Sequence, residues 1–86
     1  MIGRITKFLR VSKGLTQEEL SKMLNIGRST LSDYEREKTD INFETLEKLA
    51  EICDFEIVFK NKNTKEEITS KNVNRKDIKY EQTKKV

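Results

Sequence analysis

Histidine is absent from this chain of 86 residues, and Cys53 is its only cysteine. Without these residues, neither a Ser-His-Asp nor a Cys-His nucleophilic site can be built, and a Cys/His zinc site or an internal disulfide is equally excluded. Long apolar runs are also missing: none approaches the roughly 20 residues that span a bilayer, and no signal peptide is visible at the N-terminus. We therefore expect a small, soluble, cytoplasmic protein that binds rather than catalyses, with no cofactor, metal or small-molecule ligand and no membrane partner.

Charge and hydrophobicity divide the chain near residue 60. The net charge is +3 and the pI is near 9.0, which by itself invites an interpretation as a nucleic-acid binder. Residues 1–60, however, hold 10 basic and 11 acidic side chains, whereas residues 61–86 hold 8 and 4. The first 60 residues also carry 24 of the 29 apolar residues. The core must therefore lie in the first 60 residues, and the positive excess belongs to the remainder.

Apolar residues at helical spacing predict two helices in the first 24 residues. Gly14 should end the first helix, because glycine readily adopts the left-handed conformation that closes a helix. Thr16 and Glu19 form a capping-box pattern at the start of the second helix, which runs to about residue 24. The residues expected to face inward on these helices are Ile5, Phe8, Leu9, Ser12, Leu20, Met23 and Leu24.

Two further helices are expected before residue 54. A third begins near Arg28 and runs to about residue 36, and Asn42 has the side chain of an N-cap for a fourth that ends near Cys53. Their expected inward residues are Leu31, Tyr34, Phe43, Leu46, Leu49, Ala50 and Cys53.

After Asp54 the apolar period changes from helical to alternating. Phe55, Ile57 and Phe59 alternate with other residues, which predicts a strand over 55–60. A turn-rich link follows, and residues 65–70 could return as a weak second strand. The fold class is therefore mainly α: a four-helix domain over 1–54, a β-strand or hairpin over 55–70, and a basic tail over 71–86 that is either a short helix from about Val73 or disordered.

The second and third helices form a helix-turn-helix pattern. They are separated by a short turn that contains Gly27, with Ile26 as its buried pivot. This spacing lets the first helix lie across the second, so that the second can place a polar face in a DNA major groove about 12 Å wide. Periodicity alone leaves open a plain helical bundle that serves as an adaptor without DNA.

Three segments carry a more specific resemblance. The stretches GLTQEEL at 14–20, IGRSTLSDYE at 26–35 and FETL at 43–46 resemble the phage-repressor-like (Xre-type) helix-turn-helix family, and the match extends over residues 4–53. The resemblance implies an all-helical DNA-binding domain that acts as a dimer on a two-fold operator.

The resemblance implies that the third helix reads the bases. Arg28 is the best placed for direct readout, because its guanidinium fork matches O6 and N7 of guanine. Ser29, Ser32 and Asp33 would also face base edges, and Thr30 would touch the DNA backbone or a thymine methyl. Three alternatives stay open. Arg28 could bind a phosphate, and either serine could be an ordinary surface residue without a base contact. Asp33 could accept from cytosine or repel groups that offer only acceptors.

The family's pattern also implies phosphate contacts and one buried ion pair. Gln17, in the first turn of the second helix, would bind a phosphate, unless it is only a good helix former. Arg36 and Lys38 would hold phosphates where the chain leaves the third helix. Arg10 and Glu35 match the pair that ties the first helix to the end of the third, with an exposed pair of little energetic value as the alternative.

Glu37 departs from the family's pattern, in which a glycine usually follows the third helix. A non-glycine residue is strained in a left-handed cap. We therefore expect the third helix to run on a little or to leave by another path, which would alter the roles of the two basic residues beside it.

The strand offers a route to a dimer. A lone strand or hairpin is marginal in water, and pairing with the same strand of a second chain would cover its edge and supply a two-fold axis. The expected interface residues are Phe55, Ile57, Val58 and Phe59; the alternative is that the alternation over 55–59 simply covers the domain's own core. The partners are thus double-stranded DNA and a second copy of the chain.

The alternative is an antitoxin that regulates its own promoter through the same domain and binds a toxin through its C-terminal part. The tail would serve solubility, extra phosphate contacts or a protein partner.

Overall fold

The computed structural model describes residues 1–72 and divides the chain into two compact units, Met1–Glu56 and a second that begins at Ile57. The helix expected from about Val73, and the rest of the tail beyond it, lie outside the described residues. The two units are therefore taken one at a time.

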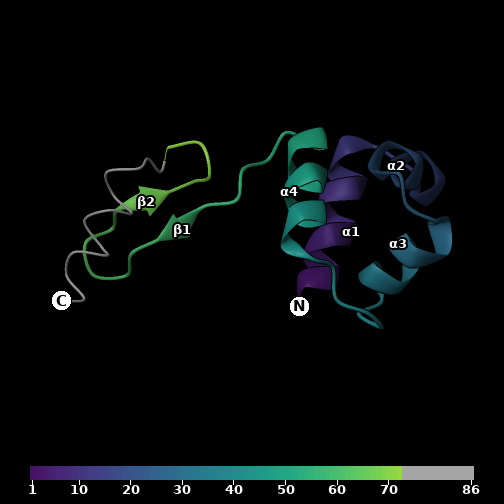
Figure 1. Cartoon of the computed structure of the whole chain (residues 1–86), viewed down its shortest axis with the longest axis horizontal. Coiled ribbons are helices and arrows are strands. Elements are labelled where there is room, and N and C mark those ends of the chain that lie inside the picture. The colour runs from purple at the N-terminus through teal and green to yellow at the C-terminus, as the bar shows by residue number, and fades with distance from the viewer. Residues whose placement is uncertain (73–86) are drawn as a thin grey trace. The chain divides into compact units, whose positions relative to one another are not determined.

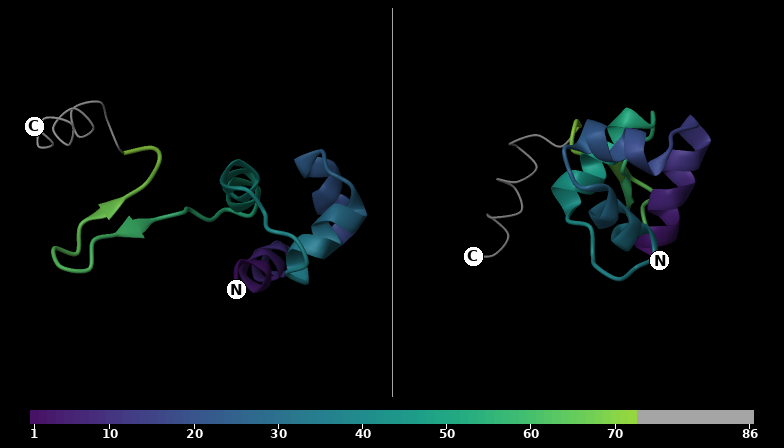
Figure 2. Two further views of the ribbon diagram at one scale, coloured as in Figure 1. Left: turned by 60° about the horizontal axis from the view of Figure 1, so that its bottom comes forward. Right: turned by 90° about the vertical axis from the view of Figure 1, so that its right-hand side faces the viewer.

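Four helices make up the first unit: α1 (Ile2–Lys13), α2 (Gln17–Leu24), α3 (Arg28–Glu35) and α4 (Phe43–Ile52). α1 packs against α3 and α4, and α2 also packs against both α3 and α4. Figures 1 and 2 show the four helices gathered around one interior. The predicted mainly helical architecture is confirmed.

The helix starts follow from local side-chain caps. The Thr16 hydroxyl accepts from the Glu19 N–H at 3.0 Å, and the Glu19 carboxylate accepts from the Thr16 N–H at 2.9 Å, so the predicted capping box is present. The Asn42 side chain accepts from the Thr45 N–H at 2.8 Å and caps α4 as predicted.

The helix ends share one geometry. Each helix is followed by a residue with positive φ: Gly14 (78°), Asn25 (59°), Glu37 (62°) and Asp54 (67°). In each case the next N–H donates back to a carbonyl five residues earlier, as Lys38 does to Asp33 at 2.9 Å, which is the pattern of a Schellman cap. The exit from each helix is thus tight and fixed by the backbone.

The core is built on Leu20, Leu31 and Leu49, each fully buried, and Thr6 is also fully buried. The further buried apolar residues are Leu9, Leu24, Ala50 and Cys53. Cys53 serves as a small apolar core residue. Its burial raises the pKa of the thiol.

Several residues predicted to face inward are exposed instead. Phe8 is 63% exposed, Met23 55% and Ile5 43%, and Phe43 is also exposed. The cause on α1 is a rotation of the buried face. Gly3, Thr6 and Leu9 are the residues of α1 that are buried, because the small Gly3 brings the helix close to the end of α3.

Phe8 consequently lies on the exposed side of α1. Its ring meets that of Phe55 edge-on, with centroids 6.4 Å apart. The Phe55 N–H donates to the Ala50 carbonyl at 2.8 Å. Phe55 therefore completes the end of α4 instead of beginning a strand.

The second unit contains a short antiparallel hairpin. β1 (Phe59–Lys60) pairs with β2 (Glu67–Ile68), with Phe59 opposite Ile68. The predicted strand over 55–60 is thus reduced to its last two residues, and the weak second strand over 65–70 to two. The Asn61 side chain accepts from the N–H groups of Asn63 and Thr64 at 2.8 and 3.1 Å, so the turn is held by its own side chain.

Candidate nucleic-acid interface

The turn between α2 and α3 sets how the two helices cross. Asn25 takes the left-handed conformation, and the Ile26 N–H donates to the Ser21 carbonyl at 2.9 Å. Ile26 is half-buried, and Leu24 and Leu31 on either side of the turn are buried. Because one face of each helix is locked into the core, the opposite face of α3 is left toward solvent.

The predicted base-reading residues lie on that outer side of α3. Arg28 and Ser29 are exposed, and Thr30, Ser32 and Asp33 are half-buried. Gly27 precedes the helix as its N-cap without a side chain of its own. The five residues thus form a continuous polar surface over the first two turns of α3.

Asp33 has a cationic neighbour on this surface. Its Oδ1 lies 3.6 Å from Nη2 of Arg36, one turn further along. An exposed pair of this kind adds little to stability, but it places a positive charge beside the carboxylate that the sequence left unassigned.

Arg10 and Glu35 meet as a two-bond pair inside the domain. Nε and Nη2 of Arg10 donate to the two Glu35 oxygens at 2.6 and 3.1 Å, and Nη1 donates to the Leu15 carbonyl at 2.8 Å. The two side chains are only 12% and 3% exposed. The pair is therefore a buried link from α1 to both the α1–α2 turn and the end of α3.

Gln17 joins this link. Its side-chain amide donates to the Glu35 carboxylate at 3.1 Å, and Gln17 is half-buried. A glutamine amide has a second N–H and a carbonyl oxygen. The first residue of α2 is thus held to the end of α3, and its side-chain amide has a further donor and an acceptor.

The chain leaves α3 through Arg36, Glu37 and Lys38, all exposed. The absence of glycine led us to expect that α3 would run on a little or leave by another path, and neither is observed: α3 ends at Glu35, and Glu37 itself adopts the left-handed conformation. Arg36 and Lys38 therefore flank a tight turn beside the last turn of α3.

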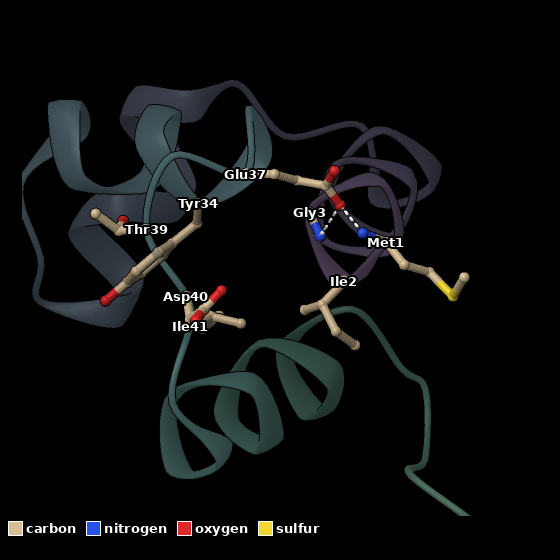
Figure 3. A pocket seen from close by; sticks show the side chains of 8 residues that line it. All are labelled: Met1, Ile2, Gly3, Tyr34, Glu37, Thr39, Asp40 and Ile41. Atoms are coloured by element: carbon tan, nitrogen blue, oxygen red, sulfur yellow. Dashed lines mark hydrogen bonds and ion pairs between the residues drawn. The ribbon is translucent and has the colours of Figure 1, made fainter.

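Glu37 makes a contact that the sequence reasoning missed. Its carboxylate accepts from the Gly3 N–H at 3.1 Å and pairs with the Met1 amino group (Figure 3). The bond to that amino group, with its positive charge and the Gly3 N–H, lowers the pKa of Glu37. The only signals in the sequence were a glycine in the first turn of α1 and a glutamate where glycine was expected.

A hollow of about 430 Å³ adjoins this contact, between the first turn of α1, the end of α3 and the loop to α4. Figure 3 shows Glu37 at one side of it and Asp40 with Ile41 at the other. Across residues 1–72, no three His, Cys, Asp or Glu side chains gather in a way that could hold a metal ion. None of the helices in that same range is long and apolar enough to cross a membrane.

Comparison with known proteins identifies the domain. The chain matches the helix-turn-helix family over residues 7–59. It is also similar to the HTH-type transcriptional regulator ImmR of Bacillus subtilis (strain 168), with 41% identity over 51 residues. That alignment covers 59% of this chain and 40% of the relative, so the chain spans well under half of the relative's length. No solved structure matches the chain. Since the family match takes in more than half of the residues, the chain belongs to the helix-turn-helix family of DNA-binding proteins.

Proposed function

We propose that the protein is a DNA-binding regulator of transcription, acting as a homodimeric repressor on a two-fold operator. The observation that carries this proposal is the polar outer face of α3, held in place by a helix-turn-helix turn and by the buried Arg10–Glu35 pair. The family match and the similarity to a transcriptional regulator support it. A repressor of this kind would act in the cytoplasm.

Direct readout falls to the first turns of α3. Arg28 stands at the helix start and is exposed, so its guanidinium can reach O6 and N7 of a guanine in the major groove. Ser29 and Ser32 follow on the same side and can bond either donor or acceptor groups. Thr30 takes the flanking backbone or a thymine methyl.

Asp33 narrows the choice of base. A carboxylate accepts hydrogen bonds and therefore suits the N4 amino group of cytosine. The Arg36 guanidinium beside it offsets part of its charge toward nearby phosphates. We therefore expect Asp33 to favour cytosine at the base that it contacts, and Arg36 to bind the DNA backbone.

The proposed phosphate contacts lie near the C-terminal end of α3. Gln17 lies at the N-terminus of α2, where backbone N–H groups and the helix dipole favour an anion. Arg36 and Lys38 follow the C-terminal end of α3, the end to which Gln17 is hydrogen-bonded through Glu35. Contacts from these three residues would fix the register of α3 on the duplex without reading sequence.

The second copy is proposed to pair through residues 55–59. Phe55, Val58 and Phe59 are exposed and Ile57 is half-buried, and a hairpin with two-residue strands is marginal by itself. Covering these residues with the same segment of a second chain supplies a two-fold axis. The two α3 helices would then enter successive major grooves about 34 Å apart.

Selection of bound duplexes from a random DNA pool tests the proposal. Enrichment of a palindrome whose half-sites are one helical turn apart is expected, and transcription from a promoter that carries this palindrome should fall when the protein is added. An Arg28→Ala variant is the control for base reading, because it should enrich half-sites that vary at one position. Absence of any enriched duplex with the wild-type chain would contradict DNA binding.

A further inference from the structure

Glu37 occupies a backbone conformation that does not suit it. Four residues follow helix ends with positive φ, and three of them are glycine, asparagine or aspartate, which tolerate the left-handed region best. Glu37, at φ 62°, is the fourth. A longer side chain in this region is held there by the surrounding structure, so the contacts of Glu37 must compensate for the strain.

The compensation comes from the N-terminal turn of α1. Met1 stands at the N-cap of α1 without a side-chain hydrogen bond, and the first turn of α1 has no acidic residue. Glu37 Oε2 accepts from the Gly3 N–H at 3.1 Å (Figure 3). A residue 34 positions away therefore supplies the anionic cap that α1 lacks locally, where the helix dipole favours negative charge.

Gly3 makes this contact sterically possible. A Cβ added to Gly3 would lie 2.3 Å from Cγ of Glu37 and 2.5 Å from the Tyr34 carbonyl oxygen. The second of these atoms belongs to the backbone of α3 and cannot move aside easily. α1 and the end of α3 therefore approach each other as closely as they do only because residue 3 has no side chain.

Backbone hydrogen bonds close the turn that carries Arg36 and Lys38, and the Glu37 carboxylate ties this turn to α1. The Glu37 N–H donates to the Tyr34 carbonyl at 3.1 Å, and the Lys38 N–H donates to the Asp33 carbonyl at 2.9 Å. The geometry points to Glu37 as a positioning residue that anchors the Arg36–Lys38 turn to α1, so that both cations face the DNA backbone. This inference rests on the proposed DNA binding and adds a residue that touches no DNA itself.

Glu37→Gly separates positioning from folding. Glycine adopts the left-handed conformation without strain, so the variant should fold, but it has no carboxylate to accept from the Gly3 N–H. We expect affinity for the selected operator to fall about tenfold, the scale of one charge-assisted hydrogen bond, and by the same factor on operators with altered bases. The slope of log affinity against log salt should flatten by about 1 for each phosphate that Arg36 or Lys38 no longer holds.

The positioning role and the loss of negative charge predict opposite changes in DNA affinity, so this test distinguishes them. Removing a carboxylate near DNA should by itself strengthen binding, so a loss of affinity opposes the electrostatic expectation. Glu66→Gln, on the exposed hairpin turn, removes the same charge elsewhere and should keep the wild-type affinity or raise it slightly. Glu37→Gln keeps the side-chain length and one acceptor oxygen, and it should fall between wild type and Glu37→Gly.

Three measurements decide the outcome: operator affinity, its salt slope, and thermal unfolding by circular dichroism. A folded Glu37→Gly with weaker binding and a flatter slope supports the inference. A folded Glu37→Gly with wild-type affinity, or with weaker binding at an unchanged slope, overturns it. Failure of the wild-type chain to bind any duplex would overturn the proposed function instead.

Discussion

Nε of Arg10 lies 2.6 Å from a carboxylate oxygen of Glu35, and the Gln17 amide donates to the other oxygen of the same carboxylate. One side chain at the end of α3 thereby connects to α1 and to the first residue of α2. α3 is held at its C-terminal end by charge-assisted bonds and along its inner side by Leu31. This arrangement fixes the outer face of α3 relative to the start of α2.

Removal of one partner of this pair should destabilise the domain strongly. Arg10→Ala leaves the Glu35 carboxylate buried without its cation, so we expect the free energy of unfolding to fall by about 3–5 kcal/mol. Urea denaturation followed by circular dichroism measures this. Lys22→Ala, which breaks the exposed 3.7 Å pair with Glu18, should cost at most about 1 kcal/mol.

The double change Arg10→Met with Glu35→Leu tests the same pair from the other side. Two apolar side chains leave no unpaired buried charge, so the double variant should be more stable than Arg10→Ala. Equal or lower stability would show that the pair's geometry, and not its uncompensated charge, accounts for the loss.

Arg28→Ala and Lys38→Ala should weaken DNA binding in different ways. Loss of Arg28 should cost about 1–3 kcal/mol and relax the preference at one base position. Loss of Lys38 should weaken binding evenly on all sequences and flatten the salt slope by about 1. Competition binding with a set of single-base operator variants distinguishes these patterns. An even loss for Arg28→Ala would assign that residue to a phosphate.

Lysine at Ile57 and Val58 should convert the proposed dimer into a monomer. Two charges placed in an apolar interface cannot be buried without a partner, so the copies should separate. Light scattering gives the mass directly. Thr64→Lys in the hairpin turn adds charge outside residues 55–59 and should leave the dimer intact. A dimer that persists in the Ile57→Lys, Val58→Lys variant would place the interface elsewhere.

Acid should weaken the Glu37 contact. The pKa of this carboxyl is lowered in the folded chain from its ordinary value of 4.5, so its contribution to stability is complete above pH 4.5 and is lost as the pH falls through the lower, folded-state value. The melting temperature of wild type should therefore exceed that of Glu37→Gln at neutral pH, and the two should converge in acid. A constant difference down to the acid limit would contradict the contact.

The helix boundaries were predictable because their causes are local. Thr16 and Glu19 are three residues apart, as are Asn42 and Thr45, and Gly14 closes α1 by its own conformational freedom. Hydrogen bonds over such short separations form from the sequence pattern itself. The helix-turn-helix arrangement was equally accessible, because the spacing of buried leucines determines which face of each helix turns inward.

Other features depended on which surfaces came together. Periodicity predicted that Ile5 and Phe8 face inward. In the structure Gly3, Thr6 and Leu9 face inward instead, because α1 approaches the end of α3 closely at Gly3, and Ile5 and Phe8 are exposed. The alternation from Phe55 predicted a full strand, but the Phe55 N–H donates to the Ala50 carbonyl at the end of α4. In both cases a local pattern was overridden by a packing contact with another element.

By itself, the sequence determined the four helices, the caps at Gly14, Thr16 and Asn42, and the polar outer face of α3, because each of these arises from residues within a few positions of one another. Only the tertiary structure decided that Gln17 bonds to Glu35 and that Glu37 caps α1 through Gly3, across 18 and 34 positions. A left-handed glutamate carries no sign of its partner in the local sequence. Its partner is set by how closely two helices can approach, which is a property of the packed core.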